Sequence, residues 1–144
     1  MSIEVSVFSD RSLSSTEEWQ RALDAEGFPL RLDASVVLSE AKGFFPAQLG
    51  GKLTGFECYH DDPAELIESC PDIDFGRPWK CALGLRFGGD FAELRAAFMA
   101  ATAYARATDG VVWDGESGEV MSPDRAREVT HEIARDTAGG AVGA

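Results

Sequence analysis

The chain has 144 residues, of which 44% are hydrophobic, and its formal net charge is −12. This length fits one domain with its own core, and the hydrophobic fraction is too high for a disordered acidic chain. The negative charge repels phosphate backbones and anionic lipid, which argues against nucleic-acid and membrane-surface roles and favours a basic partner.

The first part of the chain predicts a strand, a helix and a second strand. Apolar residues alternate with polar residues over 3–8 and again over 30–39, which is typical of strands with one apolar face. Between them, Ser14 or Ser15 can cap a helix, because a serine hydroxyl accepts from a free N–H of the first turn. Gly27 is expected to end this helix, since glycine tolerates the left-handed conformation.

The next part contains turn-forming residues and a third strand. Residues 44–46 (Phe-Phe-Pro) and 50–51 (Gly-Gly) predict a connection that forms a tight turn or a sheet edge. A strand is predicted over 52–60, and Asp62-Pro63 is expected to start a short helix over 64–69.

The clearest pattern is a strand, a helix and a strand over 79–114. Apolar side chains alternate from Trp79 to Phe87, and Asp90 can then cap a helix. Asp109-Gly110 is expected to end that helix through a left-handed glycine, and residues 111–113 form the next strand. One face of the helix is predicted to be apolar, with residues recurring every three or four positions: Phe91, Leu94, Phe98, Ala101 and Ala105.

The end of the chain predicts a hairpin and a last helix. After a turn at 114–118, residues 119–121 are expected to pair back, and Ser122-Pro123 begins the helix. The whole pattern predicts an α+β fold: a ferredoxin-like split βαβ sandwich, with a mostly antiparallel sheet, helices on one face and a C-terminal hairpin plus helix. We expect a single α+β domain over 1–136 and a flexible Gly/Ala-rich tail over 137–144.

The segment 53–76 has an unusual composition, because it is rich in acidic and aromatic residues and contains no lysine or arginine. Such a segment can form a surface for a basic partner, since complementary charge speeds encounter and aromatic side chains anchor the complex. The alternative is a solvated acidic loop that serves only solubility. The candidate partner-binding residues are Glu57, Tyr59, Asp61, Asp62, Glu65, Glu68, Asp72, Asp74 and Phe75.

Metal binding and catalysis have weaker support in the sequence than a partner-binding surface. Four nearby residues have side chains that are legitimate zinc ligands: Cys58, His60, Asp61 and Asp62. However, no second Cys/His pair has a ligand spacing. Glu128 and His131 share a helix face, yet their polar neighbours favour a surface helix over an acid–base site. We therefore expect no catalytic residues, no metal and no cofactor. The three cysteines are expected to be reduced thiols in a cytoplasmic protein, because no secretion signal is visible.

The sequence is also compatible with two alternatives to a partner-binding protein. The first is a small-ligand-binding protein or enzyme with a pocket on the open face of the sheet, around Glu57, His60 and Arg86. Glu57 and Arg86 lie on strands that we expect to be near each other. The second alternative is a structural homodimer that associates through the exposed sheet.

Three segments together resemble small bacterial immunity proteins of contact-dependent or swarming-inhibition toxin systems. They are residues 53–57, the strand 79–87 with its following helix, and residues 109–114 with the hairpin that follows. The resemblance implies a cognate toxin as partner and no catalytic residues. We expect an immunity-type binding protein, not an enzyme, that neutralises a basic bacterial toxin through the acidic surface.

Overall fold

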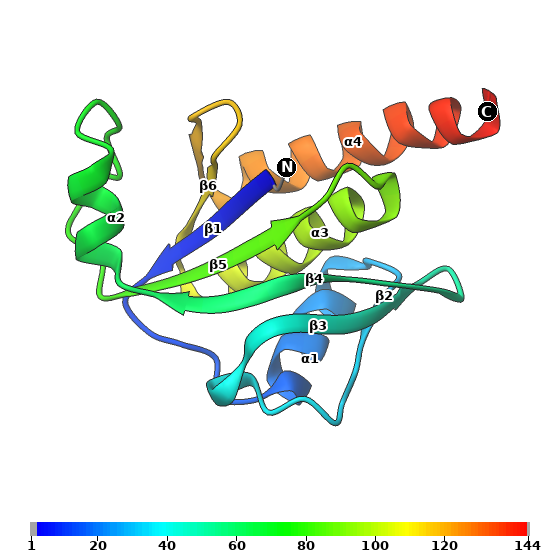
Figure 1. Ribbon diagram of the computed structural model, residues 1–144, viewed down its shortest axis with the longest axis horizontal. Helices are drawn as coiled ribbons and strands as arrows, with labels where there is room; N and C mark the ends of the chain where they lie inside the picture. Colours follow the sequence, from blue (N-terminus) through cyan, green and yellow to red (C-terminus); the bar gives the residue numbers. More distant parts are fainter. Residues whose placement is uncertain (1–2, 144) are drawn as a thin grey trace.

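The computed structural model describes residues 3–143, and their side chains up to Thr137. Within this range the protein is α+β, with an open seven-stranded antiparallel sheet in the order β2-β3-β4-β5-β1-β6-β7 (Figure 1). The strands are β1 (Ile3–Ser9), β2 (Leu30–Leu32), β3 (Lys42–Leu49), β4 (Lys52–Asp61), β5 (Cys81–Phe87), β6 (Val111–Asp114) and β7 (Val120–Met121). The helices are α1 (Thr16–Glu26), α2 (Pro63–Ser69), α3 (Phe91–Thr108) and α4 (Pro123–Gly143), with a short 3-10 helix η1 (Leu38–Glu40).

Side-chain caps fix the helix starts at the predicted positions. Ser15 caps α1, Asp62 caps α2 and Asp90 caps α3, each by accepting from backbone N–H groups of the first turn. The end of α3 differs from the prediction, because Asp109 takes the left-handed conformation with φ 57°. Gly110 is required for another reason, the close approach of the backbone of β1.

The predicted strand over 30–39 is wrong beyond Leu32. Asp33 still donates its N–H to Pro46 O, but its carboxylate then accepts from the N–H and hydroxyl of Ser35. This Asx-type turn directs the chain away from the sheet and into η1. The predicted connection over 44–46 is instead the middle of strand β3, where Pro46 is tolerated because its nitrogen points away from β4.

A tight hairpin joins β3 to β4. Gly50 and Gly51 have φ 60° and 82°, as the central residues of a type I′ turn require. The turn sets the register, in which Leu49 lies opposite Lys52 and Phe45 opposite Phe56. The third predicted strand is thus confirmed, and the structure buries Phe56 on its inner face.

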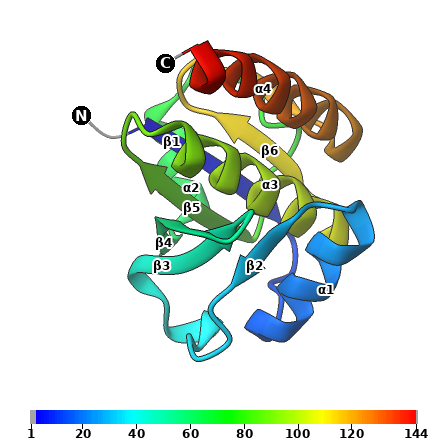
Figure 2. The same ribbon diagram turned by 90° about the vertical axis from the view of Figure 1, so that its right-hand side faces the viewer.

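Helices α1 and α3 cover one face of the sheet, and α4 packs beside α3 on the same side, where it also contacts β6 and β7 (Figure 2). The last helix therefore leaves the other face free. The centre of the core is Trp19, which is fully buried between α3 and the rings of Phe45, Phe56 and Tyr104.

The described part of α4 extends to Gly143, so it includes most of the segment predicted as a tail. Ala144 lies outside the described residues, as do Met1 and Ser2. The division into a domain over 1–136 and a flexible tail over 137–144 stays a prediction.

Candidate functional site

The face of the sheet that points away from α1, α3 and α4 is partly open. In Figure 1 this face is turned toward the viewer, with α1 and α3 behind the strands. Helix α2 and the loop after it cover one end, where a small apolar cluster forms around Phe8, Phe75 and Ala82. The rest of the face is not covered by any helix of the described residues, so its side chains are available to a partner.

The strand register places charged and aromatic side chains in a row on this open face. Glu4 of β1 lies opposite Arg86 of β5, Arg86 opposite Glu57 of β4, and Glu57 opposite Phe44 of β3. Residues that lie directly opposite each other point to the same face of a sheet, so the four side chains share one surface. The predicted proximity of Glu57 and Arg86 is confirmed by this register.

Arg86 is the centre of a polar network. Its Nε lies 3.6 Å from Glu4 Oε2, and its Nη2 lies 3.5 Å from Asp61 Oδ1. The guanidinium carbon lies 4.5 Å from the ring centroid of Tyr59, whose hydroxyl donates to Glu57 Oε1 at 2.6 Å. The carboxylates of Glu4 and Asp61 thus lie beside one guanidinium, and that of Glu57 joins the network through Tyr59. With its carboxylates ionised, the network has a net negative charge.

Asp61 is held in an unusual position by the absence of a side chain at Gly84. A methyl group at Gly84 would overlap Asp61 Oδ2, so glycine is what lets this carboxylate lie flat against β5. The Asp61 side chain is only 19% exposed, and its Oδ2 has no hydrogen-bond partner among the described residues. Burial raises the pKa of Asp61, and the attraction of Arg86 offsets this only in part.

We expect Asp61→Asn to leave the free energy of unfolding at pH 7 unchanged or to raise it, by up to about 1 kcal/mol. The folded pKa lies above the ordinary value of 3.8, so the protonated carboxyl favours the folded state. The contribution of Asp61 to stability is therefore fully present below about pH 3.8 and is lost as pH rises through the folded pKa.

Urea denaturation of the parent protein and of Asp61→Asn from about pH 3.5 to pH 7 tests the direction of this pH dependence. The advantage of Asp61→Asn should grow with pH, while Asp72→Asn in the exposed loop should show no such trend. If Asp61→Asn were clearly less stable than the parent at pH 7, the ion pair with Arg86 would outweigh the burial of the carboxylate.

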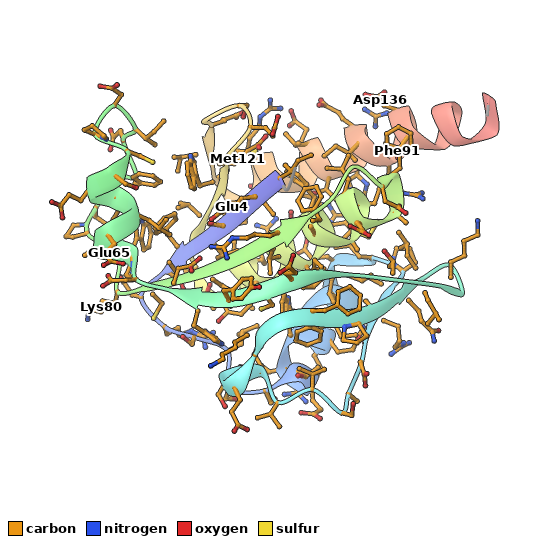
Figure 3. All side chains as sticks on the ribbon, viewed as in Figure 1. Glu4, Glu65, Lys80, Phe91, Met121 and Asp136 are labelled. Carbon is orange, nitrogen blue, oxygen red and sulfur yellow. The ribbon has the colours of Figure 1, made fainter. Side chains whose placement is uncertain are left out.

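The residues predicted to bind a partner separate into two groups and one exception. Glu57, Tyr59 and Asp61 belong to the Arg86 network on the open face. The others, at the end of the face that α2 covers, are Asp62, Glu65 and Glu68 on and before the helix, and Asp72 and Asp74 in the loop after it; all five are exposed. Figure 3 shows Glu4 on the central strands and Glu65 on α2.

Phe75 is the exception, and its assignment to the partner surface is corrected here. Its side chain is only 3% exposed, and its ring centroid lies 4.8 Å from that of Phe8 and 5.6 Å from that of Trp113. It anchors the loop after α2 onto the sheet. The acidic residues just before it in the sequence, Asp72 and Asp74, suggested exposure, but they belong to the solvent side of that loop.

Sequence reasoning missed Glu4, Gly84 and the exposed aromatic residue Phe44 as parts of this surface. The signal for Glu4 was present, because it alternates with buried residues of the first strand and so had to face away from the helices. Gly84 carried no pattern signal, since its role depends on a side chain from the neighbouring strand.

The alternative zinc set does not converge. His60 follows Tyr59 on β4 and so points to the opposite face, where its Nε2 lies 2.8 Å from Leu38 O. Cys58 is buried in the core, and burial raises the pKa of its thiol to about 12. Within residues 3–137 no three His, Cys, Asp or Glu side chains lie together in a way that could hold a metal ion.

The alternative pocket around Glu57, His60 and Arg86 is also not assembled, because His60 does not share their face. His60 instead lines a hollow of about 190 Å³ at the end of β5, together with Asp61 and Tyr104 and without Glu57 or Arg86. Small-molecule sites are usually hollows of about 300–1,000 Å³, so this one is small for a ligand.

No protein family, curated protein or solved structure matches the chain. In the part of the chain that the structure describes, none of the helices combines the length and the apolar character that crossing a membrane requires. The open face of the sheet is therefore the feature of the molecule that bears most directly on function.

Proposed function

We propose that this chain is an immunity-type binding protein, which neutralises a bacterial toxin by direct association. The contact surface would be the open face of the sheet together with the acidic border formed by α2 and the loop after it. The proposal places the protein in the cytoplasm and requires no catalytic residue or cofactor. It follows from the resemblance of the sequence and is supported by the surface described above.

The single observation that carries the proposal is the Arg86 network on an open sheet face. Its carboxylates exceed its guanidinium in charge, so a cationic side chain of a partner would complete it. Two large apolar residues are exposed on the same face: Phe44, opposite Glu57, is 62% exposed, and Leu53, four residues before Glu57 on β4, is 83% exposed. Exposed apolar side chains beside an unbalanced charge network are the combination that protein interfaces use for anchoring and for steering.

We also propose, from the order of the strands, that the fold contains a ferredoxin-like arrangement. The four strands β4-β5-β1-β6 follow each other across the sheet, with α1 after β1 and α3 between β5 and β6. This order and the placement of both helices on one face support a ferredoxin-like split βαβ unit. Strands β2, β3 and β7 would then extend that unit at its two edges.

Capture from a lysate of the protein's own source is the first test. The tagged protein is incubated at low and at moderate salt, and what it retains is identified by mass spectrometry. We expect one stoichiometric basic protein that dissociates slowly. If no protein is retained and a small molecule co-purifies instead, the proposal is wrong and the ligand-binding alternative replaces it.

Charge reversal tests the surface once the retained protein is in hand. We expect Glu57→Lys to lower the association rate about tenfold at low salt and to weaken its dependence on salt, because steering acts through charge near the contact. Asp136→Lys, an exposed position on α4 (Figure 3), changes the net charge equally and is expected to leave the rate within about twofold.

Equal effects of the two variants would show that only the net charge matters and would remove the open face from the interface. A parallel variant, Glu65→Lys on α2, separates the acidic border from the sheet itself. An effect at Glu65 without one at Glu57 would move the contact surface to the border.

A further inference from the structure

The outer edge of β3 is open along half its length. In a two-residue hairpin the pair that closes the turn exchanges both of its N–H···O=C bonds, and such pairs alternate along the ladder. Leu49 and Lys52 form that closing pair, so Phe45 and Gly43 also direct their backbone groups toward β4. Lys42 and Phe44 must then direct their N–H and C=O groups to the outside.

A second observation gives the same direction. Pro46 lies two residues after Phe44 and so directs its backbone groups to the same side as Lys42 and Phe44. Its carbonyl oxygen accepts from the N–H of Asp33 at 3.1 Å, on the β2 side. Strand β2 pairs with β3 only from Leu30 to Leu32. From Lys42 to Phe45 no strand of the described residues lies on the outer side of β3, opposite β4, and the outward groups of Lys42 and Phe44 have no backbone partner among these residues.

The loop that leaves β2 does not close this edge. The turn at Asp33 directs the chain outward, and a hollow of about 240 Å³ remains between η1 and β3, lined in part by Val37, Glu40 and Phe44. Val37 is 55% exposed and Phe44 62% exposed at its rim. The edge thus offers unpaired backbone groups beside exposed apolar side chains.

We propose that residues 42–45 of β3 are a docking site for an extended segment of the partner protein, which adds a strand beside β3 in line with β2. The proposal rests on the proposed function in its assumption of a protein partner. An extended chain is the ligand that fits, because alternate outward N–H and C=O groups are matched by the backbone of another strand.

A second copy of this chain fits the edge poorly. Pairing two copies antiparallel about Gly43 places Glu40 of one copy opposite Pro46 of the other, where β2 already lies. Pairing about Lys42 places two lysine side chains directly opposite each other, which is unfavourable. Each copy also carries a formal net charge of −12, which opposes self-association.

The free protein tests the open edge first. Hydrogen exchange followed by NMR should show fast exchange at the amides of Lys42 and Phe44 and slow exchange at those of Gly43 and Phe45. The probe is then an acetylated and amidated hexapeptide of alternating lysine and valine, which is extended and positively charged. Strand addition takes most of its affinity from the main chain, so an unrelated sequence is a fair probe.

We expect the hexapeptide at millimolar concentration to shift the amide signals of residues 42–45 and to slow exchange at Lys42 and Phe44. The same peptide with every backbone nitrogen methylated keeps its charge but loses the N–H donors of both of its edges, and it should produce neither effect. Signals that stay unchanged, or equal effects of both peptides, would overturn the docking site.

A matched pair of variants isolates the backbone group. Lys42→Pro removes the outward N–H and the charge, whereas Lys42→Ala removes the charge alone. Ala41 has φ −63° and ψ 124°, the extended conformation that suits a residue before proline. We expect Lys42→Pro to weaken hexapeptide binding about tenfold relative to Lys42→Ala, the size of one lost hydrogen bond, with both variants melting at similar temperatures.

The two proposals fail in different ways. A lysate partner retained equally by Lys42→Pro and Lys42→Ala would uphold the binding function and overturn docking at this edge. A partner lost only by Lys42→Pro would support both.

Discussion

Trp19→Ala is expected to lower the free energy of unfolding by about 3–5 kcal/mol, the cost of removing a large buried aromatic side chain. The Trp19 Nε1 donates to Ala100 O of α3 at 2.9 Å, and its ring lies 5.3–5.9 Å from the rings of Phe45, Phe56 and Tyr104. This one side chain therefore joins α1 to α3 and to two strands. Domains of this size are stable by about 5–15 kcal/mol, so the variant would retain little stability.

Urea denaturation followed by circular dichroism measures the loss; fluorescence is less suitable, because Trp79 and Trp113 also contribute. Trp19→Phe serves as the graded control. It keeps an aromatic ring in place and gives up the indole hydrogen bond, so we expect a loss of about 1–2 kcal/mol. A loss below about 1.5 kcal/mol for Trp19→Ala would mean that the surrounding rings move into the space left by the indole. The packing of α1 against α3 and the two strands would then not depend on Trp19.

Gly110→Ala is expected to cost about 2–3 kcal/mol, although the substitution adds a single methyl group. That methyl group would overlap the carbonyl oxygen of Phe8 and lie 3.0 Å from Ser9 Cβ. Both atoms belong to β1 at the place where Phe8 pairs with Val111 of β6. Because the obstacle is the backbone of a central strand and not the end of a flexible side chain, relief requires β6 to move away from β1.

Gly89→Ala is the matched control for this position. An added Cβ at Gly89 meets no atom of the described residues within 4 Å, and its backbone is not left-handed. We expect its stability to equal that of the parent or to rise by about 0.4–1 kcal/mol, because alanine restricts the unfolded chain. Thermal and urea denaturation of the two variants side by side give the comparison, and equal losses would refute the steric explanation.

The elements with a regular apolar period could be predicted from the sequence, and those set by turn chemistry could not. The period of 2 located β1 and β5, and Asp90 marked the start of α3. The strand over 30–39 failed because alternation continues past Asp33, while the carboxylate of that residue turns the chain. Strand β3 was missed because Pro46 normally argues against a strand, and only an edge position with an outward nitrogen permits it.

Most members of the polar network could be foreseen, and most of its connections could not. Glu57, Tyr59 and Asp61 stood out as part of an acidic and aromatic segment, and the proximity of Arg86 to Glu57 was predicted. Glu4 joins them only through strand register, which brings together residues far apart in the sequence. Register in an antiparallel sheet is fixed by turns and by the whole hydrophobic pattern, so a single sequence does not show which polar residues meet.

The position of β1 in the middle of the sheet has a consequence for how the protein is made. This strand is translated before the other described strands, yet its neighbours β5 and β6 come much later in the chain. The β3–β4 hairpin can close as soon as it emerges from the ribosome, whereas Val5, Val7 and Phe8 wait for partners that have not been translated. The order of synthesis and the order of assembly are thus opposed, and β1 remains an exposed apolar segment that chaperones can recognise until translation has passed β6.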